Sequence, residues 1–504
     1  MGPRNITISD LKYPVAIACI YYIISKMRLP ALTDALASST TSLAKLSLGK
    51  TQKHRVLVVG CAYGGVTAVV NLLDLEKGQA RQSVYPGAEF GGKRCRRGID
   101  ITVIDQRDGY FHSVGAPLAH VAPSHTTKMW KRFSRLNELQ NSNLSFKHGS
   151  VTSINPSSKI ATYRDRSGTE RQQEYDYVIV ATGLKRHWPA VPKSGSYEEY
   201  MQDGKKFIAK IVGGDPEKPQ VGRRVVIIGA GAVGIEFAGE IKNYYPHINV
   251  TLVHSRSQVL SSEPLPSEVK DQVATILAEE GVDVVLGNRA AITELPSGEF
   301  EVKLADGRVL TADFVIDSTK KGEPTTEIIP PQCLNKDGEI EVNGDLTFKA
   351  DIPNREAHFG VGDVIAWTGI KRAGSAMVMG QAAAQNIFAS ILNDEADPAS
   401  SSSSAGEAVS ASPPYKFTEL PSWPAVIGIA VGKQCLTYDK TNGMKFGVEV
   451  MQGYFQDDLG WSSNLKYLGL SDMVDMKENE NVDAKDDTWV EIREVGVEDV
   501  SVTA

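Results

Sequence analysis

The segment RVVIIGAGAVGIEFAGEIKNYYPHINVTLVHSR, residues 224–256, decides how this chain folds. It opens with apolar, β-branched residues at 225–228, a pattern typical of a buried parallel strand. Gly229, Gly231 and Gly234 follow at G-x-G-x-x-G spacing, a helical pattern begins at once, and a second apolar strand closes the segment. Strand, helix and strand around this spacing predict a dinucleotide-binding unit.

A glycine is needed at each of these three positions for a different physical reason. Gly229 allows a tight turn, Gly231 lets the backbone approach a pyrophosphate, and Gly234 lets the helix pack closely on the strand. The N-terminus of the helix then faces the phosphates. His254 and Arg256 follow the second strand, where an acid would select NAD and an arginine can accept a 2′-phosphate. The sequence predicts that NADPH is used at least comparably to NADH, unless Arg256 points to solvent.

A second, looser copy of the unit lies upstream and ends at Asp105. Its turn, residues 60–65, reads GCAYGG, so Ala62 stands where the middle glycine belongs. The next strand, ITVID, ends on Asp105, which either binds a ribose hydroxyl or is a turn residue at the end of a strand. An insertion at 77–98 lengthens this copy, and Cys61 is interpreted as a packing residue rather than a redox group.

Two dinucleotide units in one chain suggest a flavin site and a nicotinamide site. YDYVIVATG (175–183) and FGVGD (359–363) are short strands that end in Ala-Thr-Gly and Gly-Asp. With these motifs the chain resembles the pyridine nucleotide-disulfide oxidoreductase superfamily of flavoproteins. The resemblance implies FAD and NAD(P)H as cofactors, and it assigns the FAD contacts to Gly60, Ala62, Gly64, Gly65, Asp105, Val151, Thr182, Gly183 and Asp363.

The resemblance narrows to one branch of that superfamily. Residues 234–255, 265–287 and 338–348, together with Lys371, are similar to the apoptosis-inducing-factor-homologous, ferroptosis suppressor protein-like branch. That branch implies an NAD(P)H:quinone oxidoreductase. The chain departs from the branch at four places: Ala62, the insertion at 77–98, residues 317–320 in place of a Thr-Gly, and Leu118 near a position that carries an FAD-contacting arginine.

The predicted fold class is α/β, with two Rossmann-like dinucleotide-binding domains, one for FAD and one for NAD(P), and a smaller strand-rich C-terminal module. In that module Ile427 to Val431 and Phe446 to Val450 are interpreted as strands. The expected organisation is an N-terminal extension (1–54), an FAD-binding domain (55–192 and 325–392), an NAD(P)-binding domain (193–324), a Ser-rich linker (393–414), the C-terminal module (415–471) and an acidic tail (472–504).

Charge and cysteine content exclude several classes of function. The net charge of −7 comes from residues 472–504, which hold eleven acidic and three basic residues, so the rest is nearly neutral. Such a tail is a solvated segment or a partner-binding arm. The sequence shows no basic face of the kind that nucleic-acid binding would need. Five scattered cysteines without a C-x-x-C pair indicate a reducing compartment and no metal site, and they leave the flavin without a dithiol relay.

The N-terminal extension contains the apolar run Tyr13 to Ile24, which is too short to span a bilayer. Basic residues flank it, and three interpretations stay open: an interfacial membrane anchor, an organelle-targeting segment, or a helix docked on the protein itself. We therefore expect an intracellular protein that is membrane-associated or mitochondrial, with the cytoplasm as the alternative. The insertion at 77–98 is either a flexible surface loop or a contact for anionic lipid headgroups or a nucleotide phosphate.

Hydride transfer from NAD(P)H to flavin, followed by electron transfer to an acceptor, is the chemistry that fits these sites. Glu236 is the candidate catalytic residue near the nicotinamide, although an acid is favourable on any first helical turn. Lys371 either holds the flavin or is a solvated lysine, and His112 either faces the flavin ring or is an ordinary surface or core histidine. Three functions stay open: a membrane-associated quinone reductase, a soluble flavin oxidoreductase acting on a small metabolite, and a redox-sensing or cell-death protein.

Overall fold

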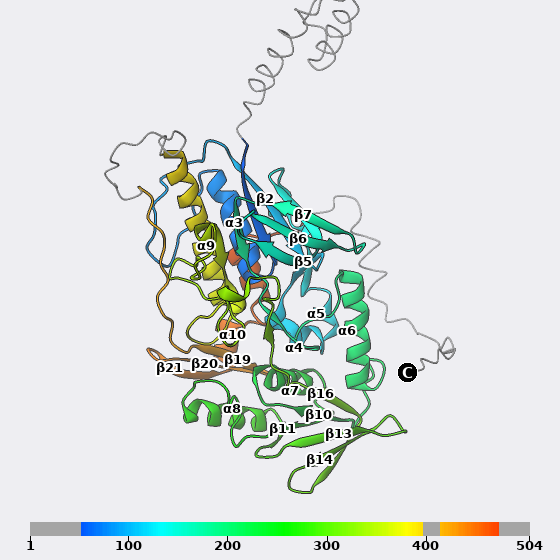
Figure 1. Cartoon of the computed structure of the whole chain (residues 1–504). Helices are drawn as coiled ribbons and strands as arrows, with labels where there is room; N and C mark the ends of the chain where they lie inside the picture. The colour runs from blue at the N-terminus through cyan, green and yellow to red at the C-terminus, as the bar shows by residue number, and fades with distance from the viewer. Residues whose placement is uncertain (1–51, 397–413, 473–504) are drawn as a thin grey trace, which may run out of the picture. The chain divides into compact units, whose positions relative to one another are not determined.

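The computed structural model of the chain describes residues 52–396 and 414–472. The apolar run at 13–24, most of the Ser-rich linker and all but the first residue of the acidic tail lie outside the described residues. The chain divides into two compact units, Met1–Lys53 and His54–Ala504, and the helices and strands labelled in Figure 1 belong to the second.

The larger sheet is built around the first glycine turn. Its seven strands lie in the order β18-β8-β1-β2-β5-β6-β7, of which the first five are parallel and the last two extend the sheet antiparallel. The strands are β1 His54–Val59, β2 Ile99–Asp105, β5 Leu144–Asn155, β6 Ile160–Asp165, β7 Glu170–Glu174, β8 Tyr177–Val180 and β18 His358–Gly360. The apolar runs of β1 and β8 are buried, as expected for parallel strands covered on both faces.

Two long helices, α3 Tyr63–Glu76 and α9 Ala373–Ala396, pack side by side against this sheet (Figure 1). Their close approach depends on glycine, because a Cβ at Gly380 would clash with the backbone carbonyl of Gly64. α9 therefore brings the segment after the Gly-Asp motif back to the first glycine turn.

The second nucleotide-binding unit has four parallel strands in the order β12-β11-β10-β16. They are β10 Arg224–Ile228, β11 Asn249–Val253, β12 Asp283–Val285 and β16 Phe314–Asp317, with helices α6 Tyr197–Val212, α7 Ala232–Tyr244 and α8 Ser267–Glu279. An antiparallel sheet follows β12 and consists of β13 Ala290–Glu294, β14 Phe300–Leu304 and β15 Val309–Ala312. The chain enters and leaves this unit through the paired short strands β9 Leu184–Lys185 and β17 Glu323–Pro324.

Shorter elements fill the segment between β2 and β5 and the turns near β18. They are β3 Gly109–Phe111, β4 Trp130–Arg132, α4 Ala116–Ala119, α5 Pro123–Thr126 and the 3₁₀ turns Ser113–Gly115, Phe133–Arg135, Asn137–Leu139, Pro331–Cys333, Arg355–Ala357 and Gly362–Val364. Among the described residues, no helix is long and apolar enough to cross a membrane.

The C-terminal module contains both strands and helices. Strands β19 Ile427–Val431, β20 Gln434–Asp439 and β21 Gly443–Gly447 form an antiparallel sheet, and α10 Val448–Tyr454 and α11 Trp461–Leu468 follow. The prediction of a strand from Phe446 to Val450 is therefore wrong beyond Gly447. That glycine has φ of +119°, which ends the strand, and the residues after it turn into α10.

The sheet of this module lies between the two nucleotide-binding units. Ala430 and Cys435 belong to the apolar core around the larger sheet, whereas Ile429 and Leu436 belong to the core around α7 and α8. A Cβ at Gly239 of α7 would clash with the backbone of the β19–β20 turn, so helix and turn are in direct contact. The module thus contacts the nicotinamide-binding unit as well as the flavin-binding one.

Candidate functional site

The motifs of the predicted flavin site converge at the C-terminal ends of the parallel strands. Gly60 has φ of +87°, and a Cβ there would lie 2.8 Å from the Ala181 carbonyl oxygen. A Cβ at Gly64 would lie 3.0 Å from a methyl of Val361, and one at Gly65 would clash with the Gly60 carbonyl. The glycine turn, the Ala-Thr-Gly segment and the Gly-Asp segment are therefore in contact, as a cofactor that touches all three requires.

Ala62 is the N-cap of α3 and is exposed at the mouth of this turn. It adds a methyl where the fingerprint has its middle glycine, so a pyrophosphate would approach over Ala62 with less room than in the second unit. Thr182 donates from Oγ1 to the Thr325 carbonyl at 3.2 Å, and Gly183 accepts from Thr325 through its own carbonyl. The Ala-Thr-Gly segment is thereby tied to the point where the chain returns from the second unit.

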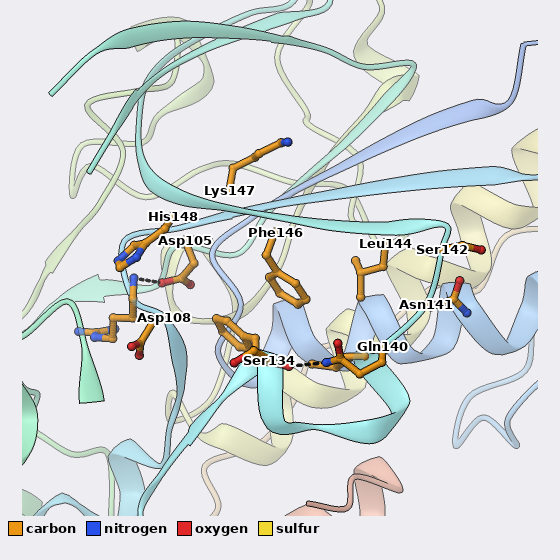
Figure 2. A pocket seen from close by; sticks show the side chains of 13 residues that line it. Asp105, Asp108, Ser134, Gln140, Asn141, Ser142, Leu144, Phe146, Lys147 and His148 are labelled. Atoms are coloured by element: carbon orange, nitrogen blue, oxygen red, sulfur yellow. Dashed lines mark hydrogen bonds between the residues drawn. The ribbon is translucent and has the colours of Figure 1, made fainter. Parts of the chain in front are cut away.

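Asp105 closes the first turn from the end of β2. Its Oδ2 accepts the backbone N–H of Cys61 at 2.6 Å. Its Oδ1 accepts the backbone N–H of Arg107 at 2.7 Å, a bond drawn in Figure 2. Burial raises the pKa of this carboxyl. Arg107 donates from Nη2 to the Pro192 carbonyl at 3.3 Å, while its buried Nε has no hydrogen-bond partner. Asp105 therefore holds the turn. The Nε–H of Arg107 could donate a hydrogen bond to a bound group.

A cavity of about 490 Å³ begins at Asp105 and runs under β5. Figure 2 shows its charged end at Asp105, Asp108 and His148 and its inner wall at Phe146, whose ring stacks on Phe133 at 4.7 Å. Val151 lies three residues beyond His148 in β5, where the register with β6 shifts. The structure thus brings Asp105 to this cavity but gives Val151 no contact with it.

Asp363 and Lys371 are both engaged in ion pairs. Asp363 Oδ2 accepts from Arg186 at 2.8 Å, a contact that the sequence pattern does not reveal. The Lys371 ammonium donates to the carbonyls of Asp363 and Ile365 and pairs with Glu339 at 2.7 Å. These three contacts match the three N–H donors of an ammonium and hold the Gly-Asp turn in place. A contact between Lys371 and flavin stays a prediction.

A buried chain of hydrogen bonds joins the first turn to the C-terminal module. Tyr63, in the first turn of α3, accepts from the Val114 N–H and shares a 3.0 Å hydrogen bond with His112 Nδ1. His112 Nε2 lies 3.0 Å from the Leu459 carbonyl, which can only accept. The proton of His112 is therefore on Nε2, and Nδ1 accepts from the Tyr63 hydroxyl. Burial lowers the pKa of His112 to about 4, so the ring is neutral.

His112 is therefore a core histidine and not a group aimed at a ligand. It is 2% exposed, and its ring packs on Trp461 at 4.9 Å. Tyr110 beside it donates to Asn464 at 2.7 Å. Sequence reasoning missed this cluster, since its partners come from the far end of the chain.

The second glycine turn has the geometry of an open phosphate cradle. Gly229 has φ of +104°, and a Cβ at Gly234 would clash with the Gly229 carbonyl, so both positions require glycine for the turn itself. A Cβ at Gly231 would meet no protein atom within 4 Å. The space in front of Gly231 is therefore open for a pyrophosphate. Ser318, in the segment where the family usually has a Thr-Gly, donates to the carbonyls of Ile228 and Gly229 and supports the turn from behind.

His254 and Arg256 lie at the open end of this unit. His254 Nδ1 accepts the Ala230 N–H at 3.2 Å, and its Nε2 lies 2.9 Å from Ser261 Oγ. Burial, and then the charge of Arg256, lower the pKa of His254. The Arg256 side chain is exposed and has no ion-pair partner among the residues that the structure describes.

Glu236 lies under the C-terminal module rather than in an open cleft. Its carboxyl accepts the N–H of Ala430, on the edge strand β19, and lies near Glu240 one helical turn later. Burial raises the pKa of both carboxyls to about 8, and neither has a basic partner in the described part of the chain. Glu236 therefore links α7 to β19, and its direct contact with nicotinamide stays a prediction.

The four cysteines in the described ranges, Cys61, Cys95, Cys333 and Cys435, are all free. Burial raises the pKa of Cys61, which keeps its thiol protonated and inert. No group of three or more His, Cys, Asp or Glu residues able to hold a metal occurs in residues 52–396 and 414–472.

Comparisons with known proteins agree with this geometry. Residues 54–380 match the family described as pyridine nucleotide-disulphide oxidoreductase. Oxidoreductase OXR1 of Ajellomyces capsulatus is 36% identical over 89% of this chain and 92% of its own length. Ferroptosis suppressor protein 1 of Xenopus laevis is 24% identical over 67% of this chain and 81% of its own.

Among solved structures, the sulfide:quinone oxidoreductase of Aquifex aeolicus has the same fold. It superposes with a TM-score of 0.54 at 16% identity, over 84% of this chain and 98% of its own. The water-forming NADH oxidase of Lactobacillus brevis superposes with a TM-score of 0.52 at 17% identity, over 76% of this chain and 75% of its own. These likenesses support the two-unit architecture.

Proposed function

Because this chain belongs to the pyridine nucleotide-disulphide oxidoreductase family, we propose that it passes electrons from NAD(P)H through FAD to a quinone-type acceptor. Whatever the acceptor, the chain is an oxidoreductase that uses FAD and NAD(P)H. When bound, FAD accepts a hydride from the nicotinamide and can pass electrons on singly or in pairs.

The chain's own residues supply binding and orientation. The turns at 60–65 and 229–234 present backbone N–H groups and the N-termini of α3 and α7 to the two pyrophosphates. Asp105 fixes the first turn, and Arg186 holds the Asp363 carboxylate at the Gly-Asp segment. Tyr63 and His112 connect the first turn to the C-terminal module.

The observation that carries the quinone proposal is that the four cysteines in the described ranges are all free. Disulfide reductases of this fold need two cysteines close together to relay electrons, and the four described cysteines are separate and unbonded. Electrons from the flavin must then pass directly to the acceptor. A quinone is a planar two-electron acceptor that needs no thiol relay. The similarity to a ferroptosis suppressor protein, and the shared fold with a sulfide:quinone oxidoreductase, support this choice.

We further propose that the protein is intracellular and peripherally membrane-associated, since long-chain quinones reside in lipid. The apolar run at 13–24, outside the described residues, is the candidate contact. Deleting residues 1–30 should weaken binding to vesicles and leave the reduction of a water-soluble quinone unchanged.

The acceptor is tested by steady-state NAD(P)H oxidation with the purified full-length chain. We expect turnover with a short-chain quinone well above turnover with oxygen alone, and none with oxidised lipoamide or glutathione disulfide, which require a cysteine relay. Turnover with a disulfide and not with quinone would contradict the proposal. Equal rates with and without quinone would indicate an oxidase instead.

A further inference from the structure

We propose that residues 93–97, KRCRR, together with Lys77, dock the folded body onto a bilayer that contains anionic phospholipids; we call these residues the basic loop. This inference concerns a surface far from the glycine turns and does not rest on the proposed acceptor.

The basic loop is the strongest positive patch in its part of the sequence. Residues 77–100 hold six basic and two acidic residues, a net charge of +4 in a chain whose net charge is −7. Lys93 and Arg94 are exposed and form no ion pair with any residue that the structure describes. The Arg96 side chain is 75% exposed, but its Nε lies 3.7 Å from the Glu395 carboxylate, and the Lys77 ammonium lies 3.9 Å from Asp74. Lys93 and Arg94 are therefore the charges available to an external partner.

The backbone of the basic loop is held in a fixed position. The Glu395 carboxylate, whose side chain is 8% exposed, accepts the backbone N–H groups of Arg96 at 2.6 Å and Arg97 at 3.1 Å. The same carboxylate bonds to His54 Nε2 at 3.0 Å. The side chain of Arg94 packs over Gly78. A preformed loop loses little conformational entropy when its side chains meet a charged surface.

The position of the basic loop also favours a membrane. The His54 N–H bonds to the Gly98 carbonyl at 3.0 Å, so the loop lies beside the start of β1. Figure 1 shows the start of β1 and the end of α9 at the same end of the sheet. Residues 1–51, with the apolar run at 13–24, join the described chain at this point. This step rests on the membrane contact proposed above for residues 13–24, since two weak contacts with one bilayer reinforce each other through effective concentration.

The chemistry of the basic loop suits a surface better than a small ligand. A free nucleotide or phosphate needs donors that converge inside a pocket, whereas these side chains are exposed on a loop. Each basic residue near an anionic leaflet raises binding about fivefold, and the attraction fades within a Debye length of about 8 Å at physiological salt. Lys93 and Arg94 together would therefore raise binding by about twentyfold.

The test uses the full-length protein and sedimentation with vesicles of phosphatidylcholine alone or with added phosphatidylserine. The variant is Lys93→Glu/Arg94→Glu, and the matched control is Lys440→Glu/Lys445→Glu, two exposed lysines on the C-terminal module. We expect the first variant to lose at least about twentyfold in binding to phosphatidylserine vesicles, with binding to phosphatidylcholine unchanged. The control should bind as wild type, and raised salt should abolish the difference.

Three results would overturn the proposal. Equal losses in both variants would mean that only net charge matters. Unchanged vesicle binding with a lower melting temperature would mean that the charges only stabilise the C-terminal ends of α3 and α9. Displacement from vesicles by inorganic phosphate or glycerophosphoserine at millimolar concentration would indicate a site for a free phosphate group rather than a surface for a bilayer.

Discussion

Asp105 and His254 occupy equivalent positions in the two nucleotide-binding units, and each accepts the backbone N–H of the second residue of its glycine turn. Asp105 Oδ2 binds Cys61 N at 2.6 Å, and His254 Nδ1 binds Ala230 N at 3.2 Å. The glycine turn is thus held by the carboxylate of Asp105 in the first unit and by the neutral imidazole ring of His254 in the second. We expect this difference in charge to suit the first site to ribose hydroxyls and to let the second accept a phosphate.

The roles of the second turn's glycines can be separated by two alanine variants. Gly231 has φ of −78°, and a Cβ there meets nothing within 4 Å, so Gly231→Ala should fold normally. The new methyl would occupy the approach of the pyrophosphate, so we expect the KM for NAD(P)H to rise roughly tenfold, with FAD content unchanged. Steady-state kinetics and the flavin absorbance of the purified protein measure both.

Gly234→Ala is the matched comparison, because its Cβ would clash with the Gly229 carbonyl. Overpacking of this kind costs about 1–3 kcal/mol, so the melting temperature should fall. A Gly231→Ala variant that melts early and binds NAD(P)H normally would show that the space before Gly231 serves the fold and not the cofactor.

FAD retention should depend on the hydroxyl of Tyr63. Tyr63→Phe leaves the Val114 N–H and His112 Nδ1 without partners, a loss of about 1–3 kcal/mol next to the first glycine turn. We expect the dissociation constant for FAD to rise about tenfold. Equilibrium titration of the apoprotein, followed by flavin fluorescence, measures it.

Tyr175→Phe provides the control. Tyr175 also shares a buried hydrogen bond with a histidine, His358 Nε2 at 2.9 Å, but it precedes β8 at the opposite end of the strands from the glycine turn. Its loss should lower the melting temperature without changing FAD affinity. If both variants weaken FAD equally, general destabilisation and not the link through Tyr63 is responsible.

The buried carboxyls of α7 should make stability depend on pH. Glu240 is 2% exposed, and burial, together with the charge of Glu280, raises its folded pKa to about 8, well above the ordinary value of 4.5. The unfolded chain releases this proton near pH 4.5 and the folded chain only near pH 8. Stability from this group is therefore complete below about pH 4.5 and is lost as the pH rises to about 8.

Glu240→Gln removes this linkage while keeping the shape of the side chain. One pKa unit corresponds to about 1.4 kcal/mol, so we expect a gain of at least about 1 kcal/mol at pH 8 that vanishes toward pH 4.5. Urea unfolding at several pH values measures it, with the exposed Glu449→Gln as control. If the gain in unfolding free energy does not vary with pH, ionisation of the Glu240 carboxyl is not its cause.

Sequence reasoning succeeded where the structure is local. Both glycine turns, the strands around them and the Ala-Thr-Gly and Gly-Asp segments were predicted, because the strand–turn–helix pattern and the glycine spacing are contained in short stretches. Residues 325–392 were assigned to the FAD-binding domain, but the packing of α9 against α3 was not predicted, since no local pattern reports it.

The links through the C-terminal module were missed for a physical reason. The Tyr63–His112 bond spans 49 residues and the His112–Leu459 bond 347, so no periodicity reports them. The placement of Glu236 on the first turn of its helix is wrong, because α7 begins at Ala232 and has no acid in its first turn. Glu236 lies farther along the helix, where its carboxyl bonds to Ala430 of β19. The sequence analysis named His254 at the end of the second strand, and the equivalent bonds Gly60 N–Ile104 O and Gly229 N–Val253 O show that it corresponds to Asp105.

The choice between NADH and NADPH should depend on Arg256, which is exposed two residues beyond His254. His254 is a neutral acceptor and its pKa is lowered, so no negative charge there repels a 2′-phosphate. A charge-assisted pair between Arg256 and that phosphate is worth roughly 1.5–3 kcal/mol, so Arg256→Ala should lose on the order of tenfold or more in kcat/KM with NADPH alone. His254→Asp would keep an acceptor for the Ala230 N–H and add charge, and should also lose NADPH selectively. If Arg256→Ala lowers kcat/KM equally with both cofactors, or with neither, Arg256 points to solvent and the site uses NADH by default.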